Sequence, residues 1–133
     1  MSKRRKLTPA EWEIMDAVWA LSAPATVRDV LESAFPNGEK AYTTVQTVLN
    51  TLEKKSLLER KKVGMVNFYT PTRTRDEVVR SEMSSMVSRV FGGSIPALAN
   101  SLLSLDDLSL EEIAEIKKIL QERERRLKEE ETS

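Results

Sequence analysis

The sequence predicts a mainly α-helical protein with a small β-hairpin. Apolar residues recur at the spacing of a helix surface over most of the 133 residues. The pattern changes to strand-like alternation only in two short runs, at about 57–62 and 66–70, which flank Gly64. Helix-start signals return after these runs. We therefore expect one domain over residues 1–72, which contains the hairpin, and a second, helical domain over residues 73–133.

The composition excludes several classes of function. The chain has no cysteine and no histidine, so we expect no disulfide, no cysteine nucleophile and no imidazole base, and neither a metal site nor another cofactor. No run approaches the roughly 18 apolar residues of a membrane span. The basic opening "MSKRRK" lacks the apolar stretch of a secretory signal. We expect a cytoplasmic protein that does not insert into a membrane.

The net charge of zero conceals an asymmetry between the two parts of the chain. Residues 1–71 contain 11 Lys+Arg and 8 Asp+Glu, whereas residues 72–133 contain 10 and 13. Five cations of the first part lie within nine positions: Lys54, Lys55, Arg60, Lys61 and Lys62. Such clustering indicates a polyanionic partner, although solvated surface lysines are the alternative explanation.

The first helix is expected from its start signals. Thr8 is a suitable N-cap, Pro9 suits the first helical position, and Glu11 completes a capping box. Four residues at helical spacing then form one apolar stripe: Trp12, Met15, Val18 and Trp19. This spacing favours core tryptophans over the alternative, a stacking platform for a ligand. Ala23–Pro24–Ala25 is expected to end the helix.

Two more helices are expected before the hairpin. The second begins at Thr26, with Asp29 three residues on, and the third covers about 42–55 after a loop rich in Pro, Asn and Gly. The buried side of the third helix is expected at Val45, Val48, Leu49 and Leu52. Three short helices followed by a hairpin with a basic first strand are the layout of a winged helix-turn-helix domain.

The opposite side of the third helix is unusual, because its residues are Thr43, Thr47, Asn50 and Lys54. Threonine and asparagine are poor helix formers, so helix stability does not explain them. Asn and Gln can hydrogen-bond adenine edges, the Thr methyl can pack on thymine, and lysines can neutralise phosphates. These properties predict a recognition helix in the DNA major groove. The candidate DNA-binding residues are Tyr42, Thr43, Thr44, Gln46, Thr47, Asn50, Lys54, Arg60, Lys61 and Lys62.

Other interpretations of the same residues are open. A threonine-rich surface can simply face solvent, and a winged helix can bind a protein without sequence-specific DNA binding. A carboxylate-based hydrolase would use paired acids such as Asp106–Asp107 and Glu111–Glu112. These pairs lie at expected helix starts, where the helix dipole favours acidic residues, so we expect a protein that is not an enzyme.

Three helices are expected after the hairpin. Capping boxes at Thr74–Glu77 and Ser109–Glu112 begin two of them, Gly92–Gly93 ends the first, and the tail after Leu127 is expected to fray. Their apolar stripes would be exposed in a single chain, which indicates an interaction surface. We predict a homodimer through this region, with folding back onto the first domain as the alternative. The candidate dimerisation residues are Val79, Met83, Met86, Val90, Leu98, Leu102, Ile113, Ile116 and Leu120.

Four stretches of the sequence resemble the penicillinase-repressor family of BlaI/MecI/CopY-type regulators. They are "LTPAEWEIMDAVW", "YTTVQTVLNTLEKKSLLER", "YTP" and "DLSLEEIAEIKKIL", and the likeness extends over about residues 6–121. The resemblance implies a dimeric winged-helix repressor that binds double-stranded DNA at inverted repeats containing TACA and TGTA elements. It also implies that Thr43, Thr44, Gln46 and Thr47 occupy base-reading positions.

The resemblance also implies a mode of regulation. The copper-responsive branch of the family has a cysteine-rich metal site, which this chain lacks, so copper sensing is excluded. In the β-lactam branch, a membrane-bound metalloprotease sensor system inactivates the repressor by cleavage of an Asn–Phe bond, and the matching pair here is Asn100–Ser101. Gly92–Gly93 and Pro96 predict easy local unfolding nearby. We expect cleavage at this pair to relieve repression.

Overall fold

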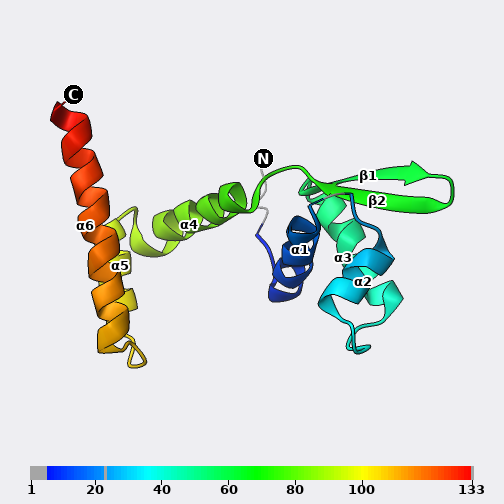
Figure 1. Cartoon of the computed structure of the whole chain (residues 1–133), viewed down its shortest axis with the longest axis horizontal. Helices are drawn as coiled ribbons and strands as arrows, with labels where there is room; N and C mark the ends of the chain where they lie inside the picture. The colour runs from blue at the N-terminus through cyan, green and yellow to red at the C-terminus, as the bar shows by residue number, and fades with distance from the viewer. Residues whose placement is uncertain (1–5, 23, 133) are drawn as a thin grey trace. The chain divides into compact units, whose positions relative to one another are not determined.

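The computed structural model describes residues 6–22 and 24–132. Its elements, in chain order, are α1 (Pro9–Leu21), α2 (Val27–Ala34), α3 (Tyr42–Lys54), β1 (Leu58–Val63), β2 (Val66–Pro71), α4 (Arg75–Phe91), α5 (Ile95–Leu103) and α6 (Leu110–Thr132) (Figure 1). Helices with one two-stranded sheet confirm the predicted fold class. The basic opening at 1–5 and Ala23 of the predicted helix break lie outside the described residues.

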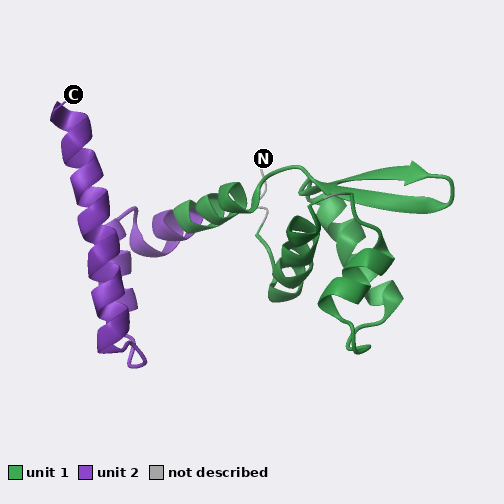
Figure 2. Ribbon diagram, in the orientation of Figure 1, with its two compact units in different colours: residues 1–84 green, residues 85–133 purple. Residues whose placement is uncertain are grey.

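The chain divides into two compact units, residues 1–84 and 85–133 (Figure 2). We call them the first and the second unit. The division falls inside α4, so the first turns of this helix belong to the first unit. The domain limit expected at 72/73 lies where the hairpin has ended and α4 is about to begin, and it stays a prediction.

A capping box starts α1, as predicted. The Thr8 hydroxyl accepts a hydrogen bond from the Glu11 amide at 3.2 Å, and the Glu11 carboxylate accepts one from the Thr8 amide at 2.9 Å. Because both bonds satisfy amides that have no partner within the helix, they fix where the helix begins. Trp12 and Trp19 pack against the hydrophobic core, with ring centroids 6.1 Å apart. The core role predicted for the tryptophans is therefore confirmed.

Among the residues that the structure describes, the hydrophobic core lies between residues 7 and 78. The apolar sides of α1, α2 and α3 meet there, and Met15, Val30, Val45, Leu49 and Leu52 are fully buried. Complete burial of such a side chain stabilises the fold by about 1.5–3 kcal/mol. The three helices therefore form a rigid support, on which the outer surface of α3 is held in place.

The hairpin pairs β1 with β2 in antiparallel register, from Leu58–Pro71 at its base to Val63–Val66 at its tip. Gly64 in the turn has a φ of +64°, a conformation that glycine adopts without steric cost. The base of the hairpin is fixed to the chain before α2, because Ala25 and Tyr69 exchange backbone hydrogen bonds of 2.9 and 2.8 Å. Its tip extends away from the three helices (Figure 1).

The beginning of α4 is attached to α1. A second predicted capping box is confirmed here, between Thr74 and Glu77. The indole nitrogen of Trp19 donates to the Arg73 carbonyl at 2.9 Å, and Arg75 forms a 2.8 Å ion pair with Asp16. Val78 is buried in the core. These contacts explain why the compact first unit includes the first turns of α4.

The glycines that end α4 and the capping box that starts α6 are found where the sequence predicts them. Gly92 and Gly93 follow α4 with positive φ, Ser94 caps α5, and Ser109 forms a further capping box with Glu112. No described residue of α5 or α6 is buried. Within the described part of the chain, no helix has both the length and the apolar character needed to cross a membrane.

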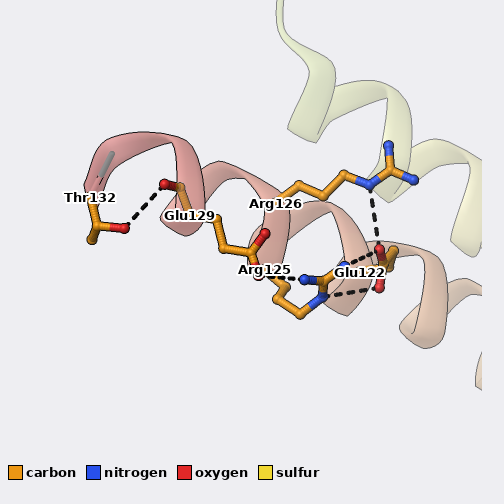
Figure 3. A network of polar contacts seen from close by, with 5 residues as sticks. All are labelled: Glu122, Arg125, Arg126, Glu129 and Thr132. Atoms are coloured by element: carbon orange, nitrogen blue, oxygen red, sulfur yellow. Dashed lines mark hydrogen bonds and ion pairs between the residues drawn. The ribbon is translucent and has the colours of Figure 1, made fainter.

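The expected fraying after Leu127 is wrong, since α6 continues to Thr132. Its last turns carry ion pairs between residues three and four positions apart: Arg125 pairs with Glu122 and Glu129, and Arg126 with Glu122 (Figure 3). Pairs at this spacing face each other on a helix and stabilise it. The hydrogen bonds from Arg125 lower the pKa of Glu122 below its ordinary value.

Candidate nucleic-acid interface

The outer surface of α3 consists mainly of exposed hydroxyl-bearing residues. Tyr42, Thr43, Thr44 and Thr47 are exposed, and Lys54 is exposed at the C-terminal end. Gln46 is half-buried at the edge of this surface. The residues opposite are those of the core, so the helix cannot rotate to hide its polar side. α3 therefore presents a fixed row of short polar side chains, as the sequence predicts.

The threonines of this surface are not equally free to form hydrogen bonds. The Thr47 hydroxyl donates to the Thr43 carbonyl at 2.9 Å, and the Thr51 hydroxyl donates to the Thr47 carbonyl at 3.0 Å. Bonds of this kind, from a threonine to the carbonyl one turn earlier, compete with helix regularity and contribute little stability. Thr47 therefore has no hydroxyl hydrogen left for a base in this conformation.

Asn50 departs from the prediction. It was expected on the exposed side of α3, but it is half-buried, and its Oδ1 accepts a 2.8 Å hydrogen bond from the Tyr69 hydroxyl. The cause is tertiary: the hairpin brings the fully buried Tyr69 against this side of the helix. Burial raises the pKa of Tyr69, while the charge of Arg60 acts in the opposite direction. Asn50 thus connects α3 to the hairpin.

The cations of the hairpin lie on both of its faces. Arg60, Lys61 and Lys62 are all exposed. Because side chains alternate along a strand and paired residues share a face, Arg60 lies on the same face as its partner Tyr69, together with Lys62. Lys61 lies on the other face. Arg60 is also 3.8 Å from Glu53 of α3. The face of the hairpin next to α3 therefore carries two of the three cations.

Lys55 is not part of the basic surface, although it belongs to the sequence cluster. Its ammonium group lies 2.7 Å from the Glu11 carboxylate and donates to the Lys6 carbonyl at 3.0 Å. Glu11 is buried, and only 6% of it is exposed. Lys55 therefore neutralises a buried carboxylate of α1 and is not available to a phosphate.

Arg28 is a surface cation that the sequence reasoning missed. It is exposed in the first turn of α2, and its guanidinium lies 5.9 Å from the centre of the Tyr42 ring at the start of α3. A cation over an aromatic ring is a favourable contact. No sequence signal marks this pair, because Arg28 and Tyr42 lie on different helices. The contact adds a positive charge at the N-terminal end of the α3 surface.

The remaining candidate residues lie on α4, α5 and α6. Asn100 and Ser101 are exposed within α5. Of the acidic residues considered for catalysis, Glu112 serves in the capping box of α6, and no group of described residues could hold a metal ion. The candidate dimerisation residues are half-buried (Val79, Met86, Leu98, Ile113, Ile116) or exposed (Met83, Val90, Leu102, Leu120).

Comparison of the sequence with known proteins agrees with the geometry of the first unit. The sequence matches the penicillinase repressor family over residues 7–122. The chain belongs to this family. It is 32% identical over 129 residues to the penicillinase repressor of Bacillus licheniformis, a match that covers 97% of this chain and 100% of that protein. It is 24% identical over 119 residues to the methicillin resistance regulatory protein MecI of Staphylococcus aureus strain N315, covering 90% and 96% of the two chains.

The fold comparison agrees with the family. The solution structure of the DNA-binding domain of the repressor BlaI matches with a TM-score of 0.50 and 30% identity, over 58% of this chain and 93% of that domain. The predicted family and winged-helix fold are confirmed. As a member of the penicillinase repressor family, the protein is a DNA-binding transcriptional repressor.

Proposed function

We propose that the protein represses transcription as a homodimer, in which each copy places α3 in the major groove of one half of an inverted-repeat operator. The observation that carries this proposal is the exposed row of Thr43, Thr44 and Thr47 on a helix held by a buried core. A helix fits the major groove, where each base pair presents a distinct pattern of groups. We also propose that the protein is cytoplasmic and has no catalytic role, because the ligand proposed for its site is operator DNA.

The proposed interface combines base contacts with phosphate contacts. Thr44, Gln46 and Thr47 contact base edges, whereas Lys54 and Lys62 contact phosphates on either side of the groove. Lys54 is exposed at the end of α3, and Lys62 is exposed on the hairpin face that also carries Tyr69. Phosphate contacts fix the register of a protein on the duplex, and base contacts read the sequence.

Two kinds of substitution distinguish these roles. Gln46→Ala should lose about 1–3 kcal/mol of binding free energy at one base pair and relax the preference there, because a base contact is local. Lys62→Ala should weaken binding to all sequences and lower the slope of log K against log salt by about one. Lys117→Ala, an exposed lysine of α6, is the matched control. If Gln46→Ala and Thr47→Ala proteins both kept full sequence preference, the assignment of α3 would be wrong.

The homodimer is proposed from the second unit. Its helices expose apolar side chains on α4, α5 and α6, including Val90, Leu102 and Leu120. Contiguous exposed apolar surface marks an interaction site, and a two-fold homodimer is the commonest assembly. A two-fold dimer would present two α3 helices to a two-fold operator, which supplies the contacts that one winged helix lacks.

We further propose that cleavage near Asn100–Ser101, by a membrane-bound metalloprotease sensor system, relieves repression. Both residues are exposed on α5, which has nine residues and buries none of those described. A helix with so little buried surface opens locally at small cost, as a protease requires. A cut here would separate α6 from the DNA-reading unit. Loss of a linked second site can reduce binding by about 10²–10⁴-fold.

Mass spectrometry of the intact protein in its native host tests the cleavage. During cell-wall stress, a fragment ending at Asn100 should appear as transcription of the target genes rises. An Asn100→Gln chain, which changes the cleavage site at an exposed position, should stay intact and keep repressing. If target transcription rose in the wild type while the full-length mass persisted, proteolysis at this pair would not be the switch.

A further inference from the structure

Three threonines lie one helical turn apart along α3: Thr43, Thr47 and Thr51. Each of the last two donates its hydroxyl hydrogen to the backbone carbonyl of the one before it, at 2.9 Å for Thr47 and 3.0 Å for Thr51. Thr47 is the member of this row that is both exposed and bonded in this way. Because a threonine in a helix interior stabilises it less than most residues do, a contribution to folding does not explain the row.

The back-bonded hydroxyl determines what Thr47 offers to a partner. The Cβ of threonine carries two heavy-atom branches in staggered positions, a hydroxyl and a methyl. When the hydroxyl is turned to the Thr43 carbonyl, the methyl is the only heavy-atom branch left to point elsewhere. The hydroxyl hydrogen is engaged as well. The side chain therefore presents an oriented methyl group in the middle of the exposed surface of α3.

We propose that Thr47 recognises a thymine by contact between its methyl group and the 5-methyl group of that base, while its hydroxyl only holds the rotamer. The inference rests on the proposed placement of α3 in the major groove. Thymine is the base that presents a methyl group there, and apolar contact is how a threonine methyl recognises it. Reading by the Thr47 hydroxyl as a donor would break the bond to the Thr43 carbonyl.

The flanking threonines make the assignment specific to Thr47. Thr43 and Thr44 are both exposed, and within the described part of the chain neither side-chain hydroxyl forms a hydrogen bond. Their hydroxyls can still rotate toward a base or a phosphate. The surface of α3 therefore contains two hydroxyls that are free to donate, on Thr43 and Thr44. Beside them lies the oriented methyl group of Thr47, which can make only apolar contacts.

The test removes the 5-methyl group from the base and, separately, the hydroxyl or the methyl group from Thr47. The full-length chain first selects its site from random duplex DNA. Each thymine of the selected half-site is then replaced by uracil, which removes only the 5-methyl group. Three proteins are compared: wild type, Thr47→Val, which keeps a methyl and strongly prefers one rotamer in a helix, and Thr47→Ser, which keeps the hydroxyl. Thr72→Ser is the control, because Thr72 is exposed and also donates to a backbone carbonyl, but it lies outside α3.

One thymine should account for the methyl contact. Replacing it by uracil should weaken the wild type and Thr47→Val by about fourfold per half-site, the factor that corresponds to about 0.8 kcal/mol for one buried methyl-sized group. Thr47→Ser should be weaker by the same factor on the thymine site and insensitive to uracil, and Thr72→Ser should behave as wild type. If the chain selects a site but no uracil substitution affects it, or if Thr47→Val loses as much as Thr47→Ser, the inference is wrong while the repressor assignment stands. If no sequence is enriched at all, the proposed function itself fails.

Discussion

Lys54 and Lys55 are neighbours in the sequence with different environments. Lys54 is exposed at the end of α3, whereas Lys55 is paired with the buried carboxylate of Glu11 and with the Lys6 carbonyl. Glu11 also belongs to the capping box of α1. Removing one partner of such a pair leaves a buried charge without compensation, which is far costlier than removing an exposed lysine.

We predict that the two alanine substitutions affect different properties, stability for Lys55 and DNA binding for Lys54. Lys55→Ala should lower the free energy of unfolding by about 1–3 kcal/mol, less than a fully buried pair would lose, because the Lys55 side chain is partly exposed. Lys54→Ala should change stability by less than about 0.5 kcal/mol and weaken DNA binding instead. Urea unfolding followed by the fluorescence of Trp12 and Trp19, together with binding titrations, measures both quantities. Equal losses of stability in the two variants would contradict the assignment.

Tyr69 is the second residue whose role depends on burial. Its hydroxyl donates to Asn50, and its pKa is raised above the ordinary value of 10.0 by burial. The folded protein therefore keeps the phenol proton at a pH where the unfolded chain has lost it. The stabilisation is complete below the unfolded pKa and is lost as the pH rises through the folded pKa.

Tyr69→Phe should remove both effects. It should cost about 1 kcal/mol near neutral pH, since the Asn50 oxygen loses its donor. The wild type should lose stability as the pH rises above about 10, and the phenylalanine variant should lack this component. Urea unfolding at a series of pH values, monitored by the tryptophans, provides the comparison. The same alkaline decline in both proteins would show that another group is responsible.

At the scale of the elements, the sequence predicts local features well and tertiary ones poorly. The capping boxes at Thr8, Thr26, Thr74 and Ser109 all form as expected, because each depends on residues three positions apart. Asn50 departs from its prediction because Tyr69, which reaches it, lies on another element. Lys55 and Arg28 follow the same rule, since their partners Glu11 and Tyr42 are far from them in the sequence.

The end of α6 departs from its prediction because of local ion pairs. Ion pairs at spacings of three and four residues support the helix to Thr132 without any buried residue among those described (Figure 3). Each such exposed pair contributes little by itself, but several succeed one another along these turns. The apolar stripe that ends at Leu120 and Leu127 is thereby carried on a continuous helix.

At the scale of the whole molecule, the two units differ in how they are stabilised. The first unit has the hydrophobic core, while α5 and α6 bury none of their described residues. The chain therefore contains one part that folds around its own core and one part that exposes apolar surface. This difference is the physical argument for a partner, and a second copy of the chain would give the two-fold symmetry that an inverted repeat requires.

Selection of binding sites from random duplex DNA, by the full-length chain and by a Met86→Asp/Ile116→Asp variant, tests the central claim most directly. Both residues lie outside the core at 7–78, so the variant should keep a folded first unit and become monomeric. The wild type should enrich an inverted repeat whose half-sites lie about one helical turn, roughly 10 base pairs, or a multiple of it apart. The variant should bind a single half-site, and more weakly. A site without a repeat for the wild type, or equally tight binding of the same repeat by the variant, would contradict the account.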